Sequence, residues 1–119
     1  MKIVNMTPHT LHLQLPSGEM MEIEPSGQVP RVQQTETALE GYDGLPLPVI
    51  RVEYGLADEL PEEQPGVYYV TSALYAQCVP HRRDVLIPAR MVRDEKGRIV
   101  GCTALARVSE SFDKPERVK

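Results

Sequence analysis

The residues of this chain that are best suited to chemistry lie in one short stretch, CVPHRRDVLIPAR, at positions 78–90. An imidazole, two guanidinium groups and a carboxylate stand side by side there, in the order His81, Arg82, Arg83 and Asp84. A guanidinium keeps its charge at any physiological pH, and its planar donors can make two parallel hydrogen bonds to a phosphate. The stretch therefore predicts contact with a small phosphate-bearing ligand. The alternatives are that these arginines are solvated, or that Arg83 forms a structural ion pair with Asp84 that orients the loop.

Other signatures of enzyme and metal sites do not occur in the sequence. There is no GxxxxGK or GxGxxG phosphate loop, and there is no CxxC or HExxH motif. His9 and His12 are three residues apart, which places them on opposite faces of a strand. Cys78 and Cys102 have no metal-ligand spacing, and we expect both to be free thiols. We therefore expect no catalytic residues, no metal and no cofactor.

Charge is distributed unevenly along the chain. The formal net charge is -4, but residues 1–78 hold three cations against eleven carboxylates, and residues 79–107 hold seven cations against three. An acidic protein is a poor match for duplex nucleic acid, which is usually bound by a broad basic face. The chain also lacks an apolar run of the ~18 residues that a membrane helix needs, and it lacks a signal-peptide pattern, so we expect a cytoplasmic protein.

The elements that must position the basic stretch are mostly short strands. Alternation of apolar and polar residues, broken by PSG and by DEKG turns, predicts about seven strands, at 2–5, 10–15, 19–24, 47–54, 67–72 and on both sides of the turn at 94–97. Residues 28–34 and 84–88 are expected to be extended as well. Residues 34–46 and 55–66 are expected to be loops.

One short helix is expected at residues 73–78, with Ser72 as its N-cap. Tyr68 and Tyr69 alternate on the preceding strand, so one of them should be buried. The predicted fold class is a β-rich α+β domain, with antiparallel strands in hairpins that form a curled sheet or small barrel. We assign residues 1–107 to this single domain and residues 108–119 to a polar C-terminal tail.

Four segments together resemble the Thoeris anti-defence family, first type. They are KIVNMTPHTLHL near the start, EPSGQVPRV, the block GVYYVTSALYAQCV with RRDVLIPAR, and the closing RDEKGRIVGCTAL. The resemblance covers residues 2 to 107, and Met6 stands where a leucine is expected.

The resemblance implies a phage-encoded sponge in the host cytoplasm. Such proteins sequester cyclic ADP-ribose isomers without cleaving them, and some also take up cyclic oligonucleotides. They assemble as dimers and hexamers with pockets at protomer interfaces. On this basis Arg31, Arg83 and Arg107 are expected to bind phosphate and Tyr75 to stack on adenine. Thr7 and Ser72 are candidates for ribose or phosphate hydrogen bonds.

Two other functions stay open. The first is an enzyme that opens a cyclic nucleotide, with His81 or His9 as general acid or base. The second is a small accessory or structural protein of a phage. A nucleotide pool that is mixed with the protein, washed and released by heat would separate these functions, because a sponge returns the intact cyclic nucleotide and an enzyme returns a linear product.

The small aliphatic core, with no tryptophan and one phenylalanine, also favours a homo-oligomer that is at least a dimer. That phenylalanine, Phe112, lies in the tail. Docking of its ring on the same chain or a neighbour would contribute about 1.5–3 kcal/mol. We expect a chain cut after Val108 to fold, but to assemble more weakly or bind ligand less tightly. Light scattering and ligand titration test this, and equal mass and affinity would show that the tail is a passive extension.

Overall fold

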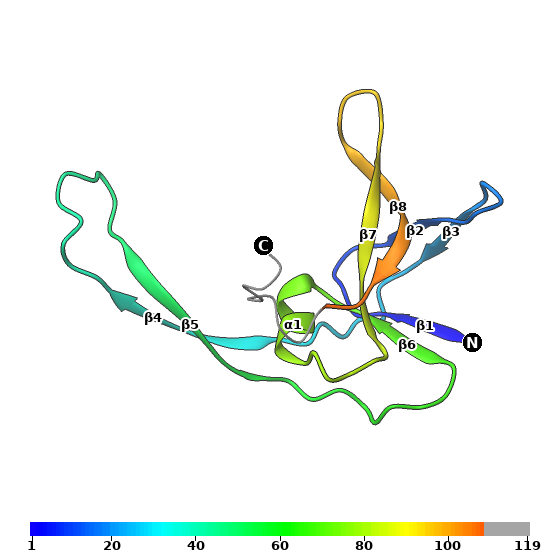
Figure 1. Cartoon of the computed structure of the whole chain (residues 1–119), viewed down its shortest axis with the longest axis horizontal. Coiled ribbons are helices and arrows are strands. Elements are labelled where there is room, and N and C mark those ends of the chain that lie inside the picture. Colours follow the sequence, from blue (N-terminus) through cyan, green and yellow to red (C-terminus); the bar gives the residue numbers. More distant parts are fainter. Residues whose placement is uncertain (109–119) are drawn as a thin grey trace, which may run out of the picture.

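The computed structural model describes residues 1–108, so the tail and Phe112 lie outside the described residues. Within residues 1–108, eight strands and one helix follow one another (Figure 1). Their bounds are β1 (Lys2–Asn5), β2 (Leu11–Gln14), β3 (Met20–Ile23), β4 (Val32–Ala38), β5 (Ile50–Ala57), β6 (Val67–Val70), α1 (Ala73–Cys78), β7 (Val85–Arg93) and β8 (Ile99–Ala106). The predicted class, a β-rich α+β fold with one short helix, is confirmed.

Six strands form one mixed sheet in the order β1-β6-β7-β8-β2-β3. The hairpins β2–β3 and β7–β8 are antiparallel, as their turn residues predict, and Gly97 has the expected positive φ. Three parallel pairs complete the sheet: β2 with β8 joins the two hairpins, β6 with β7 adds β6, and β1 with β6 adds the edge strand β1. Gly101 allows the β2–β8 pair, because a Cβ atom there would lie 2.9 Å from the carbonyl oxygen of His12.

The six-stranded sheet curls until its two edge strands approach each other. Asn5, at the end of β1, is buried, and its amide nitrogen donates to the carbonyls of His9 (2.7 Å) and Ile23 (2.9 Å). Its amide oxygen accepts from the backbone N–H and the hydroxyl of Thr7. Because Ile23 ends β3, one side chain links both edges of the sheet and holds it as a nearly closed barrel.

The apolar core lies on the inner side of this curl. The alternation predicted for residues 10–15 is confirmed, since Leu11 and Leu13 are buried and His12 is exposed. Leu11 and Leu13 pack with Val70 and Cys102. The partly buried side chains of Ile3, Ile23 and Leu105 extend this cluster. Every member of this cluster is aliphatic apart from Cys102, and the buried rings of Tyr69 and Tyr75 lie outside it. The cluster therefore has few large apolar contacts to stabilise it.

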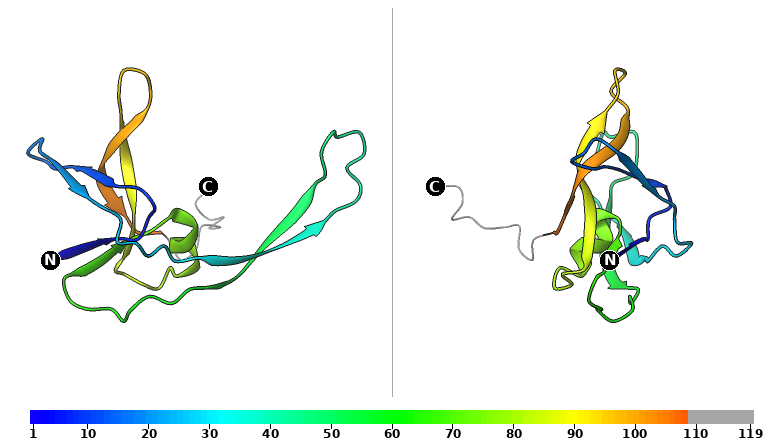
Figure 2. Two further views of the ribbon diagram at one scale, coloured as in Figure 1. Left: turned by 180° about the vertical axis from the view of Figure 1, so that it is seen from behind. Right: turned by 90° about the vertical axis from the view of Figure 1, so that its right-hand side faces the viewer.

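The other two strands, β4 and β5, form an antiparallel arm that leaves the body (Figures 1 and 2). The sequence predicted a loop from residue 34, but residues 34–38 pair with β5 and are strand. The radius of gyration is 17.7 Å, against about 13 Å for a compact chain of about 100 residues. The arm therefore gains little from the core of its own chain.

The helix and the last hairpin position the basic stretch between them. Ser72 caps α1 as predicted, because its hydroxyl accepts from the backbone N–H of Tyr75. Residues 85–93 form one continuous strand, where two extended pieces were expected, and Arg90 within it has a φ of 54°. In residues 1–108 no helix has the length and apolar character needed to cross a membrane.

The Asn5 amide generates the first structural prediction. In Asn5→Asp a carboxylate oxygen faces two backbone carbonyls, and two hydrogen bonds are lost. Unsatisfied buried groups cost about 1–3 kcal/mol each, so we expect the free energy of unfolding to fall by about 3 kcal/mol in urea denaturation. The matched change at an exposed amide, Gln28→Glu, should stay within about 0.5 kcal/mol of the wild type. Equal stability of the two variants would show that Asn5 does not hold the sheet closed.

Candidate functional site

The turn between α1 and β7 sorts the two neighbouring arginines to different environments. The N–H of Arg82 donates to the carbonyl of Val79, and the N–H of Val85 donates to the carbonyl of Arg82, which makes the turn tight. Arg82 is partly buried, whereas Arg83 is exposed. Only one of the two guanidinium groups is therefore free to meet a ligand.

Arg82 is used by the fold. Its Nε and Nη2 atoms donate to the two carboxylate oxygens of Asp84, each at 2.8 Å, and Nη2 also reaches the carbonyl of Pro61. The carboxylate is 3% exposed. The hydrogen bonds to Asp84 raise the pKa of Arg82 further above its ordinary value. The structural ion pair considered for Arg83 and Asp84 is therefore wrong in its partner: Asp84 binds Arg82.

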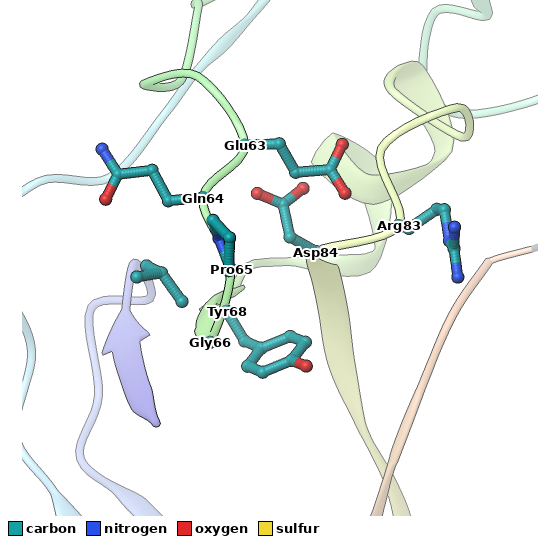
Figure 3. A pocket seen from close by; sticks show the side chains of 8 residues that line it. Glu63, Gln64, Pro65, Gly66, Tyr68, Arg83 and Asp84 are labelled. Atoms are coloured by element: carbon teal, nitrogen blue, oxygen red, sulfur yellow. The ribbon is translucent and has the colours of Figure 1, made fainter.

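Arg83 borders a hollow of about 360 Å³ that opens to solvent. Figure 3 shows the loop residues Glu63, Gln64 and Pro65 on one side of it, Arg83 on the other, and Tyr68 from β6. The Tyr68 side chain is 38% exposed, while Tyr69 is buried, as the alternation on this strand predicts. Because Arg82 neutralises Asp84, Glu63 and Arg83 are the two charged side chains of the lining without that pairing.

Tyr75, expected to stack on a base, has no free ring face in this structure. It is 1% exposed, and its hydroxyl donates to the carbonyl of Asp58. Burial raises the pKa of the phenol. The exposed aromatic side chain next to the basic stretch is instead Tyr68. The sequence signal for an exposed tyrosine here was the pair Tyr68 and Tyr69 on one strand, since neighbouring strand residues point to opposite faces.

Arg31 lies at the base of the arm, away from the lining of the Arg83 hollow. Its N–H donates to the Asp58 carboxylate and its carbonyl accepts from the N–H of Asp58, and the side chain is exposed. Arg107 is closer to the basic stretch, because its Nη2 donates to the carbonyl of Pro80 at 3.2 Å. The phosphate-binding roles of both residues stay predictions.

The two hydroxyl candidates already have partners within the fold. Thr7 Oγ1 donates toward Asn5 Oδ1 (2.6 Å) and His9 O (2.9 Å), and Ser72 Oγ caps the helix. Neither residue lines the Arg83 hollow. Of the six predicted site residues, the structure therefore places Arg83 at the hollow and Arg107 against Pro80 in the basic stretch, and it distributes the other four elsewhere.

The histidines of the enzyme hypothesis lie in separate places. His81 is exposed beside a second hollow of about 300 Å³, with Tyr75, Arg82 and Asp58 in its lining. His9 borders an apolar hollow near β2 and β8. Within residues 1–108 no group of three metal-ligating side chains comes together.

Comparisons with protein-family models, curated proteins and solved structures find no match to this chain.

The different environments of the two arginines predict different responses to the same substitution. Arg82→Ala leaves a buried carboxylate without its partner, and breaking such a pair costs about 3–5 kcal/mol. Arg83→Ala removes an exposed side chain, and the change in unfolding free energy should stay within about 0.5 kcal/mol. Thermal and urea denaturation of the two variants measure the difference. Comparable losses in both would mean that Arg83 is also a structural residue.

Proposed function

We propose that this protein binds a compact cyclic nucleotide, a cyclic ADP-ribose isomer or a cyclic oligonucleotide, and holds it intact. The observation that supports this best is the hollow in which the exposed guanidinium of Arg83 and the exposed ring of Tyr68 lie together. A cyclic nucleotide carries phosphate charge and a flat base on one small molecule. A site that binds it therefore needs one cationic group and one aromatic group.

Each side chain of the lining has a place in this binding mode. Arg83 makes charge-assisted hydrogen bonds to a phosphate, which are stronger than neutral ones. Tyr68 stacks on the base, and a base–aromatic stack contributes about 1–3 kcal/mol. Gln64 and Glu63 offer hydrogen-bond partners for ribose hydroxyls or for an amino group of the base. Asp84 stays with Arg82 and keeps the turn in place.

One open hollow gives only part of the affinity that sequestration requires. Nanomolar binding corresponds to about -12 kcal/mol, and known ligand pockets enclose most of the surface of their ligand. A hollow of about 360 Å³ that faces solvent leaves much of a cyclic nucleotide uncovered. The proposal therefore includes a homodimer or larger homo-oligomer in which a second copy covers the ligand. In an infected cell such binding would remove an immune signal, the role that the anti-defence resemblance implies.

The decisive experiment is calorimetric titration with cyclic ADP-ribose and, separately, with a cyclic dinucleotide. Loss of one charge-assisted contact in Arg83→Ala should weaken binding about ten- to a hundredfold. Tyr68→Ala should weaken it by a similar factor through the lost stack. Arg98→Ala is the matched control, because it removes the same charge at the far tip of the β7–β8 hairpin, and its affinity should equal that of the wild type.

The bound material is then released by heat and identified. Recovery of the intact cyclic nucleotide supports sequestration. A linear product would replace the proposal with the hydrolytic enzyme. Absence of binding to either ligand, or equal losses in Arg83→Ala and Arg98→Ala, would contradict the proposed site.

A further inference from the structure

The β4–β5 arm carries an apolar face that nothing in residues 1–108 covers. In the register of the arm, Glu36 lies opposite Val52 and Ala38 lies opposite Ile50. Residues two apart on a strand share a face, so Ile50, Val52 and Tyr54 define the apolar face, and all three side chains are exposed. Leu56, which is 78% exposed, lies beyond the register shift between Gln34 and Val32, so the alternation does not assign it to this face.

The opposite face of the arm is polar. It holds Thr35, Thr37, Arg51 and Glu53, paired in register across the two strands. A hairpin with one polar and one apolar face normally packs the apolar face against another layer, and a two-stranded ribbon by itself is only marginally stable in water. The apolar face of the arm thus requires a partner surface. The body of the same chain does not provide one, because the arm extends away from that body (Figures 1 and 2).

A matching surface exists elsewhere on the same chain, at the β7–β8 hairpin. An apolar hollow of about 350 Å³ lies between this hairpin and β2, with Leu11, Pro88, Met91, Ile99 and Val100 in its lining. Ile99 is 55% exposed, and Met91 and Val100 are also exposed. The hairpin and the arm project from the body in different directions, so the arm does not cover this hollow within one chain.

The two surfaces are both apolar, and the segments that carry them have opposite net charges. Arm residues 32–57 hold one cation and four carboxylates, a net charge of -3, whereas residues 85–106 hold four cations and two carboxylates, a net of +2. Each surface also holds a charge beside its apolar residues. Glu36 lies across from Val52 on the apolar face of the arm, and Arg93 lies across from Ile99 on the hairpin.

From this match we propose that the arm of one copy docks its apolar face on the β7–β8 hollow of a second copy. In a two-fold dimer the contact occurs twice, because each copy supplies one arm and one hollow. Opposite charges at the two surfaces fix the pairing of arm with hairpin and disfavour arm with arm. This contact is independent of nucleotide binding and specifies the surfaces of the oligomer proposed above.

The first test is the mass of the full-length protein in solution by light scattering. We expect at least twice the 13.3 kDa of one chain at micromolar concentration. Val52→Glu on the arm and Ile99→Glu at the hollow should each raise the dissociation constant at least a hundredfold. Thr37→Glu, on the polar face of the same arm and opposite Arg51, is the matched control and should leave the mass unchanged. Circular dichroism checks that every variant keeps its strands.

A mixing experiment then identifies the surfaces. When Val52→Glu and Ile99→Glu proteins are combined, one copy still has an intact arm and the other an intact hollow, so we expect heterodimers to form. Recovery should also follow when Glu36→Lys is combined with Arg93→Glu in one chain, since the charges are exchanged.

Three results would overturn the inference: a monomeric wild type, an Ile99→Glu protein that associates like the wild type, or mixed variants that stay monomeric. The second and third results together, with Val52→Glu monomeric, would mean that two arms pack on each other. A dimer that binds no cyclic nucleotide would refute the proposed function alone. A monomer that binds one would refute this inference and the enclosure of the ligand by a second copy, and it would leave nucleotide binding at Arg83 standing.

Discussion

The buried ion pair between Asp84 and Arg82 is the contact on which most of the remaining structure depends. Asp84 directly precedes β7, and its carbonyl accepts from the N–H of Tyr69 in β6 at 2.8 Å, so β7 starts beside β6. The same guanidinium holds the acidic loop through the Pro61 carbonyl. Since a charge with so little exposure must keep its partner, Arg82 turns inward and Arg83 outward. An acidic chain can thus present a cation to a ligand without a broad basic surface, since one structural pair and one tight turn determine which cation is free.

Local sequence signals predicted the elements whose hydrogen bonds are themselves local. Ser72 before an apolar hexamer gave the helix start, Gly97 gave the turn, and the leucines at 11 and 13 gave the buried face of β2. The parallel pairs lacked such a signal, because strands far apart in sequence make them and no turn residue marks their register. Residues 34–38 were missed for a related reason: their polar side chains show no alternation, and they are strand because β5 pairs with them.

The candidate site was predictable in kind but only partly in detail. The sequence identified a basic turn next to tyrosines, and the structure places Arg83 and Tyr68 on one hollow. Sequence adjacency cannot decide which of two neighbouring arginines pairs with a carboxylate. The choice of Arg82 also depends on its contact with the Pro61 carbonyl, in a loop 21 residues earlier. Sequence adjacency also cannot decide whether a helical tyrosine is exposed. Tyr75 is buried because its hydroxyl finds the Asp58 carbonyl at the base of the arm, a contact 17 residues away.

The arm and the β7–β8 hollow leave apolar surface of a single copy in contact with water. The main core cluster consists of aliphatic side chains and Cys102, yet exposed Leu, Ile, Val and Tyr side chains are concentrated on the arm, where they contribute nothing to that cluster. Apolar surface of this kind gains free energy only when water is removed from it, at about 25 cal/mol per Å². Under the proposed function the hollow beside Arg83 has the same requirement, since a guanidinium binds a phosphate most strongly when bulk water is excluded. A second copy that covered both surfaces would meet both requirements, and it would link the stability of the fold to the enclosure of the proposed ligand.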